Sequence, residues 1–346
     1  MSKLPKNFYD ALLRGQVIPA HPLALNKRRK LDERRQRALS RYYLAAGAGG
    51  LAVGVHTTQF AVRDQDLLKP VLEIAAEEIT KCSNEDCLGI AGVIGKTQQA
   101  VREATLAVDL GYHAVLLSLG AFANCCDEDM ISHCKEIAEI TPIVGFYLQP
   151  SVGGRPLTYE FWRKFSEIEN VVAIKVAPFN RYQTVDVLRG LVDSGRSDEI
   201  ALYTGNDDSI VIDLLTKHVF SDVELHFAGG LLGHWAVWTR KAVNIFHKCR
   251  RYRNSRDPIP QEMLSLAVEV TDCNAALFDV KNNFAGCIPG IHEVLHRQKL
   301  LDGIWCIDPK ETLSPGQASE IERVSTQYPH LVDDHFVEEH LDDWLH

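Results

Sequence analysis

The sequence predicts an α/β protein: a (β/α)8 barrel, or TIM barrel, over residues 1–250, followed by a C-terminal helical region over residues 251–346. Short apolar runs alternate with longer amphipathic runs through the first part, and the alternation stops near residue 250. Eight such units of roughly 30 residues each are what a barrel of this kind requires. A doubly wound open sheet produces the same alternation, but the count of eight favours the barrel.

Each predicted strand is a nearly continuous apolar run, as expected for strands that are covered on both faces. The sixth run, Val-Val-Ala-Ile-Lys-Val, departs from this only at Lys175. The predicted strands are 17–20, 51–55, 88–93, 114–119, 143–148, 171–176, 200–204 and 224–227.

The predicted helices of the barrel show apolar residues at helical spacing on one face. They are 31–46, 65–79, 97–110, 128–140, 159–169, 183–192 and 235–248. In the C-terminal region the helical patterns are 258–275, 289–301 and 317–326. The closing segment 336–345 carries apolar and acidic side chains on opposite faces, which indicates a helix that docks one face on a domain or subunit.

Composition excludes several classes of protein. The chain has 346 residues, 46% of them hydrophobic and 24% charged, so it can form a packed core. A net charge of −9 argues against a nucleic-acid partner, and the basic cluster between Lys27 and Arg37 is interpreted as a solvated helix face. No apolar run is long enough to span a membrane, and the N-terminus lacks the apolar core of a signal peptide.

Cysteine spacing supports a cytoplasmic location. The nine cysteines form no disulfide framework, so reduced thiols are expected. No histidine or further cysteine lies near Cys82 and Cys87 in the sequence to complete a zinc site, and no metal or cofactor is predicted.

Lys175 is the first candidate for chemistry, because active sites of β/α barrels lie at the carboxyl ends of the strands. Burial in an apolar strand would lower the pKa of the lysine and leave a neutral amine able to attack a ketone. The alternative is an outward-facing lysine paired with an acid at the strand end.

Two further strand ends carry hydroxyl groups. Tyr147 ends the fifth strand and could shuttle protons at the barrel mouth, or be an aromatic core residue. His56-Thr57-Thr58 follows the second strand, where the threonine hydroxyls and successive N–H groups could cradle a carboxylate, or simply cap a helix.

In this order, the threonine pair, Tyr-x-x-Pro and the strand-six lysine resemble the dihydrodipicolinate synthase / N-acetylneuraminate lyase family. The resemblance also covers the glycine-rich third strand, Gly205-Asn206-Asp207-Asp208 after the seventh, and Leu313-Ser314-Pro315. It implies a class I aldolase or related lyase, usually a homotetramer, that needs no cofactor and acts on pyruvate or another 2-oxo acid.

The resemblance also implies roles for individual residues. Lys175 would form the Schiff base, and Tyr147 would shuttle protons. Thr57 and Thr58 would hold the substrate carboxylate, with Thr58 also linked to the Tyr147 hydroxyl. Gly205 would line the pocket where close approach leaves no room for a side chain.

Departures from the family pattern point away from the synthase reaction. Gln59 and Phe60 replace a glycine and a glutamate, and residues 119–124 lack the relay tyrosine that a neighbouring subunit would supply. Val152 stands where the synthases place an arginine for the second substrate's carboxylate, although Arg155 could substitute. The predicted specificity residues are therefore His56, Phe60, Phe122, Val152 and Arg155.

Two other functions are open. His292-Glu293-Val294-Leu295-His296 matches the H-E-x-x-H pattern of zinc hydrolases, without a clear third ligand motif. A catalytically silent barrel that binds a metabolite is the second. The Gly47–Gly50 stretch precedes a strand, so it is interpreted as a helix end and not a dinucleotide loop.

Overall fold

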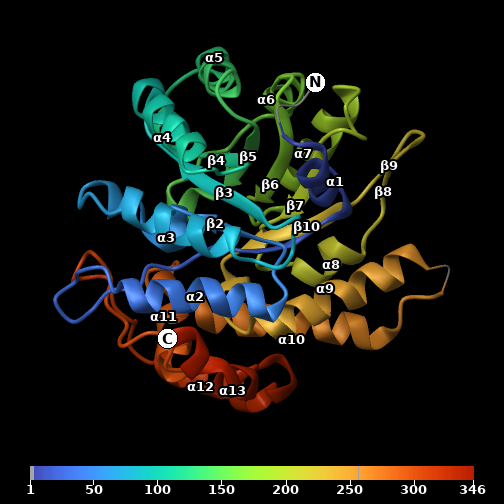
Figure 1. Ribbon diagram of the computed structural model, residues 1–346. Helices are drawn as coiled ribbons and strands as arrows, with labels where there is room; N and C mark the ends of the chain where they lie inside the picture. The colour runs from blue at the N-terminus through green and yellow to red at the C-terminus, as the bar shows by residue number, and fades with distance from the viewer. Residues whose placement is uncertain (1–3, 256) are drawn as a thin grey trace.

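The computed structural model describes residues 4–255 and 257–346 and has an eight-stranded parallel sheet at its centre (Figure 1). The strand order is β1-β10-β7-β6-β5-β4-β3-β2. A parallel bridge between Ala20 and Ala52 joins the two ends of this order, and the His21 N–H donates to the Ala52 carbonyl at 2.8 Å. The sheet therefore curls into a barrel, which confirms the predicted fold class.

The strands lie close to the predicted ranges except for the eighth. They are β1 (Val17–Pro19), β2 (Gly50–Val53), β3 (Leu88–Val93), β4 (Ala114–Leu117), β5 (Ile143–Leu148), β6 (Val171–Ala177), β7 (Ala201–Thr204) and β10 (Phe227–Leu232).

The prediction of 224–227 as the eighth strand was wrong. Val223–Leu225 (β9) pairs antiparallel with His218–Phe220 (β8) in a separate hairpin, and the barrel strand is β10. Two glycines inside β10 weakened its strand pattern. They are required there, because a Cβ on Gly229 would lie 2.2 Å from the Gln16 carbonyl oxygen and one on Gly230 would lie 2.5 Å from the Trp235 ring.

Helices surround the barrel (Figure 1). The unpredicted α1 closes one end of it, where the Tyr203 hydroxyl donates to the Leu12 carbonyl and the Tyr9 hydroxyl to the Glu199 carbonyl. The helices are α1 (Lys6–Arg14), α2 (Glu33–Ala46), α3 (Leu68–Thr80), α4 (Thr97–Asp109), α5 (Asp127–Ala138), α6 (Tyr159–Ser166), α7 (Arg181–Asp193), α8 (Ile210–Leu215) and α9 (Thr239–Asn254). No helix in the described part of the chain is long and apolar enough to cross a membrane.

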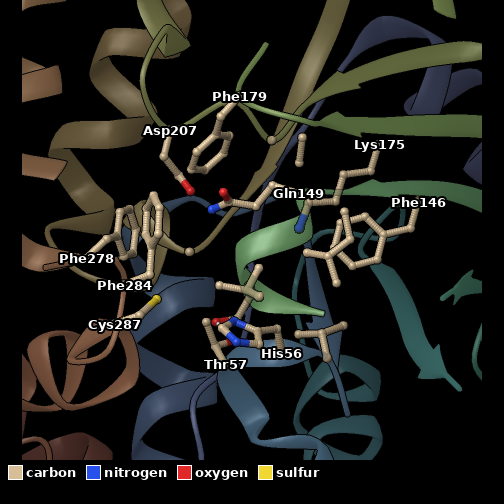
Figure 2. A pocket seen from close by; sticks show the side chains of 17 residues that line it. His56, Thr57, Phe146, Gln149, Lys175, Phe179, Asp207, Phe278, Phe284 and Cys287 are labelled. Carbon is tan, nitrogen blue, oxygen red and sulfur yellow. The ribbon is translucent and has the colours of Figure 1, made fainter. Parts of the chain in front are cut away.

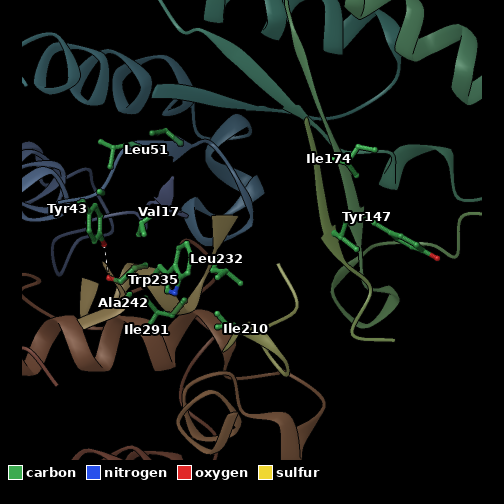
Figure 3. Close-up of a cluster of buried hydrophobic side chains, with 14 of the residues drawn as sticks. Val17, Tyr43, Leu51, Tyr147, Ile174, Ile210, Leu232, Trp235, Ala242 and Ile291 are labelled. Carbon is green, nitrogen blue, oxygen red and sulfur yellow. Dashed lines mark hydrogen bonds between the residues drawn. The ribbon is translucent and has the colours of Figure 1, made fainter. Parts of the chain in front are cut away.

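Alternation along each strand separates an inner core from an outer one. Val144, Phe146 and Leu148 of β5 belong to the cluster inside the barrel, whereas Tyr147 belongs to the cluster between strands and helices. Figure 3 shows Tyr147 beside Ile174 of β6 in that outer cluster. Strand parity thus decides which side chains reach the barrel interior.

Four helices follow the barrel: α10 (Gln261–Leu277), α11 (Cys287–Arg297), α12 (Gln317–Gln327) and α13 (Asp334–Leu345). They gather on one side of the molecule, with α10 against α8 and α13 against α2 (Figure 1). The buried Asp333 carboxylate accepts from the Tyr42 hydroxyl, the Arg240 N–H and the Gln298 side chain. The division of the chain at residue 250 stays a prediction, and α9 runs across that position.

The basic cluster near the N-terminus is less solvated than predicted. Arg34 and Arg35 on α2 donate to the carbonyls of Leu345 and Lys299, and Arg37 pairs with Glu77 and Glu78. These arginines join α2 to the C-terminal helices and to α3, so contacts within the protein use part of the charged face.

Candidate active site

A cavity lies at the carboxyl ends of the strands and contains Lys175 (Figure 2). The polar side chains that line it are His56, Thr57, Gln149, Lys175 and Asp207. Most of the remaining wall is apolar: Ala20, Val55, Phe146, Leu148, Val152, Ala177, Phe179, Phe278 and Phe284. A concave, largely apolar pocket with a few convergent polar groups is the usual form of a small-molecule site.

Lys175 points into this cavity from β6. Lys175 is only 8% exposed, and its Nζ atom lies 4.3 Å from the centre of the Phe146 ring. Burial lowers the pKa of Lys175 to about 8, and the Asp207 carboxylate acts in the opposite direction. The alternative of an outward lysine in an ion pair does not describe this arrangement.

Asp207 faces the same cavity from the segment after β7, the strand next to β6. Burial raises the pKa of this carboxyl to about 7, and the nearby Lys175 charge opposes that rise. The His234 backbone N–H nearby lowers the pKa of this carboxyl, and its Oδ1 atom is buried without a hydrogen-bond partner. The family resemblance includes Asp207 but implies no role for it.

His56 and Thr57 line the cavity on a 3-10 turn, His56–Thr58. Burial and the Lys175 charge lower the pKa of His56 to about 4, so its ring is neutral near pH 7. The Thr57 hydroxyl donates to the Ala20 carbonyl at 2.7 Å. The turn and Thr57, two parts of the predicted carboxylate cradle, therefore lie at the cavity.

Thr58 lies behind this turn. Its hydroxyl donates to the His21 carbonyl at 2.6 Å and accepts from the N–H groups of Gly54 and Val55. The predicted link from Thr58 to the Tyr147 hydroxyl is not formed. Thr58 instead holds the shape of the turn that presents His56 and Thr57.

The structure does not bring Tyr147 to the cavity. Its hydroxyl donates to the Leu157 carbonyl at 3.2 Å and accepts from the Leu157 N–H at 3.0 Å. The neighbouring Phe146 takes the inward position on β5. The predicted position of a tyrosine hydroxyl at the barrel mouth was wrong, because adjacent strand residues face opposite sides.

Arg155 is also turned away from the cavity. Its guanidinium donates to the carbonyls of Phe122 and Cys125 at 2.7 and 2.8 Å. It therefore does not replace the arginine that the synthase pattern places at Val152, and Val152 itself lines the pocket. Among the described residues that line the cavity, Lys175 is the only one with a cationic side chain.

Gly205 lies against the lysine, as the resemblance implied. A Cβ at this position would lie 2.7 Å from Lys175 Cε and 2.8 Å from the Ala177 Cβ. Contacts this short would push the lysine side chain out of place. Gly205 thus leaves room for the Lys175 side chain as well as lining the pocket.

The C-terminal region supplies one wall of the cavity, which sequence reasoning missed. Phe278 and Phe284 come from the segment between α10 and α11, and Cys287 is the first residue of α11 (Figure 2). Phe284 packs against Phe179 of the barrel at 5.8 Å between ring centres, and both residues adopt positive φ angles. No local pattern indicates such a contact between residues far apart in the chain.

The H-E-x-x-H segment lies on α11 outside this cavity. His292 is fully buried with Nδ1 3.9 Å from the Cys306 sulfur, whereas His296 is exposed and Glu293 pairs with Arg297. Among residues 4–255 and 257–346, no group of three or more His, Cys, Asp or Glu side chains could hold a metal ion. The arrangement does not favour a zinc hydrolase.

The fold and the cavity together define the class: a β/α barrel with a buried lysine at the carboxyl face of its strands. A model of the Dihydrodipicolinate synthetase family matches residues 14–222, more than half of the chain. The chain belongs to this family, as the sequence motifs predicted.

Two named enzymes illustrate how distant the relatives are. The N-acetylneuraminate lyase of Citrobacter koseri is 28% identical over 206 residues, which are 59% of this chain and 66% of the lyase. The 4-hydroxy-tetrahydrodipicolinate synthase of Alkaliphilus oremlandii is 32% identical over 116 residues, 33% of this chain and 38% of the synthase. The matched parts thus span less than two thirds of either relative.

Solved structures agree with the fold over nearly the whole chain. The dihydrodipicolinate synthase of Cyanidioschyzon merolae with lysine bound superposes with a TM-score of 0.76 at 18% identity, covering 92% of this chain and 99% of that one. The N-acetylneuraminate lyase of Fusobacterium nucleatum complexed with pyruvate gives 0.72 at 16% identity, with 93% and 99% covered. At such low identity these likenesses establish the barrel and its C-terminal helices alone.

Proposed function

We propose that this protein is a lyase of the class I aldolase type that acts on pyruvate or another 2-oxo acid through an imine on Lys175. The observation that carries the proposal is the Lys175 amine itself, which faces an apolar cavity with a pKa lowered to about 8. An amine with that pKa is partly neutral near pH 7 and can attack a ketone carbon. Family membership supports the same chemistry.

In the proposed reaction Lys175 Nζ attacks the carbonyl carbon of the 2-oxo acid, and loss of water forms the imine. Thr57 and the turn that carries it would hold the substrate carboxylate, which requires the Thr57 hydroxyl to rotate away from the Ala20 carbonyl. His56, neutral and in the same turn, would offer a ring N–H to the same carboxylate. Gly205 would keep the amine free to reach the carbon.

We test this proposal by incubating the protein with pyruvate and sodium borohydride and measuring intact mass. A reduced pyruvate adduct is expected in the wild type and in Lys164→Arg, whose lysine is on the surface and pairs with Glu128. The adduct should disappear in Lys175→Arg. No adduct with pyruvate or with any of a panel of 2-oxo acids would overturn the proposal and favour a silent, metabolite-binding barrel.

We also propose that the second part of the substrate is uncharged and apolar, so that the reaction is not that of the true synthases. Val152 lines the pocket where those enzymes have an arginine, and Arg155 is committed to backbone carbonyls. A carboxylate on the second substrate would face Asp207 and three phenylalanine rings, Phe179, Phe278 and Phe284. Burial of an unpaired charge there is unfavourable.

Val152→Arg tests this assignment. A guanidinium at the rim could form a charge-assisted hydrogen bond worth about 1.5–3 kcal/mol. The ratio of kcat/KM for a carboxylate-bearing aldehyde to that for benzaldehyde, each condensed with pyruvate, should rise by about 10- to 100-fold. Val152→Leu is the matched control and should leave the ratio low. A wild-type enzyme that prefers the charged aldehyde would contradict the proposal.

Assembly and location are further proposals. We propose a homo-oligomer, a tetramer or a dimer, in the cytoplasm, on the basis of family membership and reduced cysteines. Light scattering after size-exclusion chromatography measures the assembly directly, and a monomer at micromolar concentration would contradict it.

A further inference from the structure

The proposed imine chemistry requires a group that moves protons next to the bound substrate, and this inference rests on that chemistry. Carbon–carbon cleavage removes a hydroxyl proton from the substrate, and release of the product adds a proton to carbon. Lys175 cannot serve in the cleavage step because its nitrogen is then part of the imine. Tyr147 is bonded to the backbone of Leu157 on the outer side of the barrel.

Asp207 has the position that the role demands. Asp207 follows β7, and β7 pairs with β6 so that Tyr203 is opposite Lys175. The side chains of Asp207 and Lys175 enter the same cavity (Figure 2). No ion pair joins Lys175 to Asp207 among the described residues, and both line the same cavity. The buried Oδ1 atom has no hydrogen-bond partner and is free to accept a proton.

Asp207 is anchored from outside the barrel through its backbone. The Asn274 amide on α10 donates to the Asp207 backbone carbonyl at 2.6 Å, and the nearby His234 N–H lowers the pKa of the carboxyl. The charged groups that act on it are Lys175, which favours the ionised form, and Asp208, which opposes it. A carboxyl whose pKa is near 7 can both accept and return a proton at neutral pH.

The other polar groups of the cavity suit proton transfer less well. The pKa of His56 is lowered to about 4 by burial and by the Lys175 charge, so near pH 7 its ring is neutral and only a weak base. Burial raises the pKa of the Cys287 thiol well above its ordinary value, so it stays protonated. The Thr57 hydroxyl is bonded to the Ala20 carbonyl.

We propose that Asp207 is the catalytic acid–base that exchanges protons with the imine-bound substrate in the place of a tyrosine. In the cleavage of a 4-hydroxy-2-oxo acid, the Asp207 carboxylate takes the proton of the 4-hydroxyl. The carbon 3–carbon 4 bond then breaks, its electron pair moves toward the imine nitrogen to form an enamine, and an aldehyde leaves. Asp207 returns the proton to carbon 3, and water hydrolyses the imine to release the 2-oxo acid and the free lysine.

The test separates imine formation from proton transfer in the full chain. Borohydride trapping with pyruvate measures the imine, and exchange of pyruvate methyl protons for deuterium, followed by NMR in D2O, measures proton transfer at carbon 3. In Asp207→Asn the trapped adduct should persist while exchange falls by about 100-fold or more. Asp208→Asn, the adjacent exposed carboxylate outside the cavity, should retain both.

Each outcome is decisive. Exchange within about threefold of wild type in Asp207→Asn overturns the inference, as does exchange that is lost in Tyr147→Phe and retained in Asp207→Asn. Absence of the adduct in the wild type refutes the proposed function itself, a different result. Should Asp207→Asn fail to fold by circular dichroism, Asp207→Glu is used, with the adduct retained and exchange expected to fall by about tenfold.

Discussion

At the scale of single residues, the site depends on which of two neighbours faces the barrel interior. On β5, Phe146 faces the lysine and Tyr147 packs outside the strands, although the motif spacing matches the family's tyrosine. The local result is an amine near an aromatic ring, in a cavity that His56 and Asp207 also line.

The pH dependence of imine formation reports the Lys175 environment. Because burial lowers the pKa of Lys175 to about 8, the neutral amine accumulates as pH rises through that value. The initial rate of borohydride-trapped adduct formation should rise between pH 6 and about 8.5 and then level off. The Asp207 carboxylate raises the lysine pKa, so Asp207→Asn should move this inflection to lower pH. An inflection near 10.5, the ordinary lysine value, would contradict the assignment.

Gly205→Ala should lower the reactivity of the Lys175 amine more than it lowers the stability of the fold. The new methyl group would meet Lys175 Cε at 2.7 Å and force that side chain to move. The rate of adduct formation should fall about tenfold or more, since displacement by about an ångström is costly in an active site. Gly233→Ala is the comparison. Its added Cβ would come no closer than 3.3 Å to the Phe278 ring, so the fall in the rate of adduct formation should be smaller. Equal rates in wild type and Gly205→Ala would show that the lysine tolerates displacement.

At the scale of elements, α10 links the C-terminal region to the site. Asn274 donates to the carbonyl of Asp207, and Thr271, one turn earlier, donates to the carbonyl of Asp208. Phe278 follows directly as a wall of the cavity. The helix therefore positions the β7–α8 segment from outside the barrel, and the C-terminal region contributes to the active site as well as to packing.

Asn274→Ala tests this positioning role. Loss of a buried hydrogen bond should lower the free energy of unfolding by about 1–3 kcal/mol. Deuterium exchange into pyruvate should fall further than adduct formation does, because Asp207 and not Lys175 loses its anchor. Thr271→Val removes the companion bond to Asp208 and should spare the exchange rate. A purely structural role for Asn274 would lower both rates in proportion to the folded fraction.

At the scale of the whole molecule, the barrel and the C-terminal helices share one apolar core. The outer cluster contains Leu39 and Val243 of the barrel helices together with Leu277, Ile291 and Val337 of the C-terminal helices. Asp333 connects α2, α9 and the end of α11 through three hydrogen bonds. We therefore expect the two sides of the predicted division at residue 250 to unfold together.

Thermal unfolding tests this shared core. Scanning calorimetry of the full chain should show one transition with equal calorimetric and van't Hoff enthalpies, which is the mark of a single cooperative unit. A chain ending at residue 250 should fail to fold, because it exposes the outer cluster and cuts α9 before Asn254. Two separate transitions, or a folded truncated chain, would establish two domains instead.

The sequence alone determined the barrel, the family and the position of the buried lysine, because all three depend on local patterns. Strand periodicity, the apolar context of Lys175 and short motifs at strand ends are visible without a fold. The eighth strand is the exception, because Gly229 and Gly230 interrupt the apolar pattern by which a strand is predicted.

Only the tertiary structure decided which side chains meet around the lysine. Strand parity decides that Phe146, and not Tyr147, faces the cavity. Contacts between distant segments decide that Arg155 turns away and that Asp207 and Phe284 line the cavity. Such contacts leave no periodic mark in the chain, since they form only when separate elements pack together.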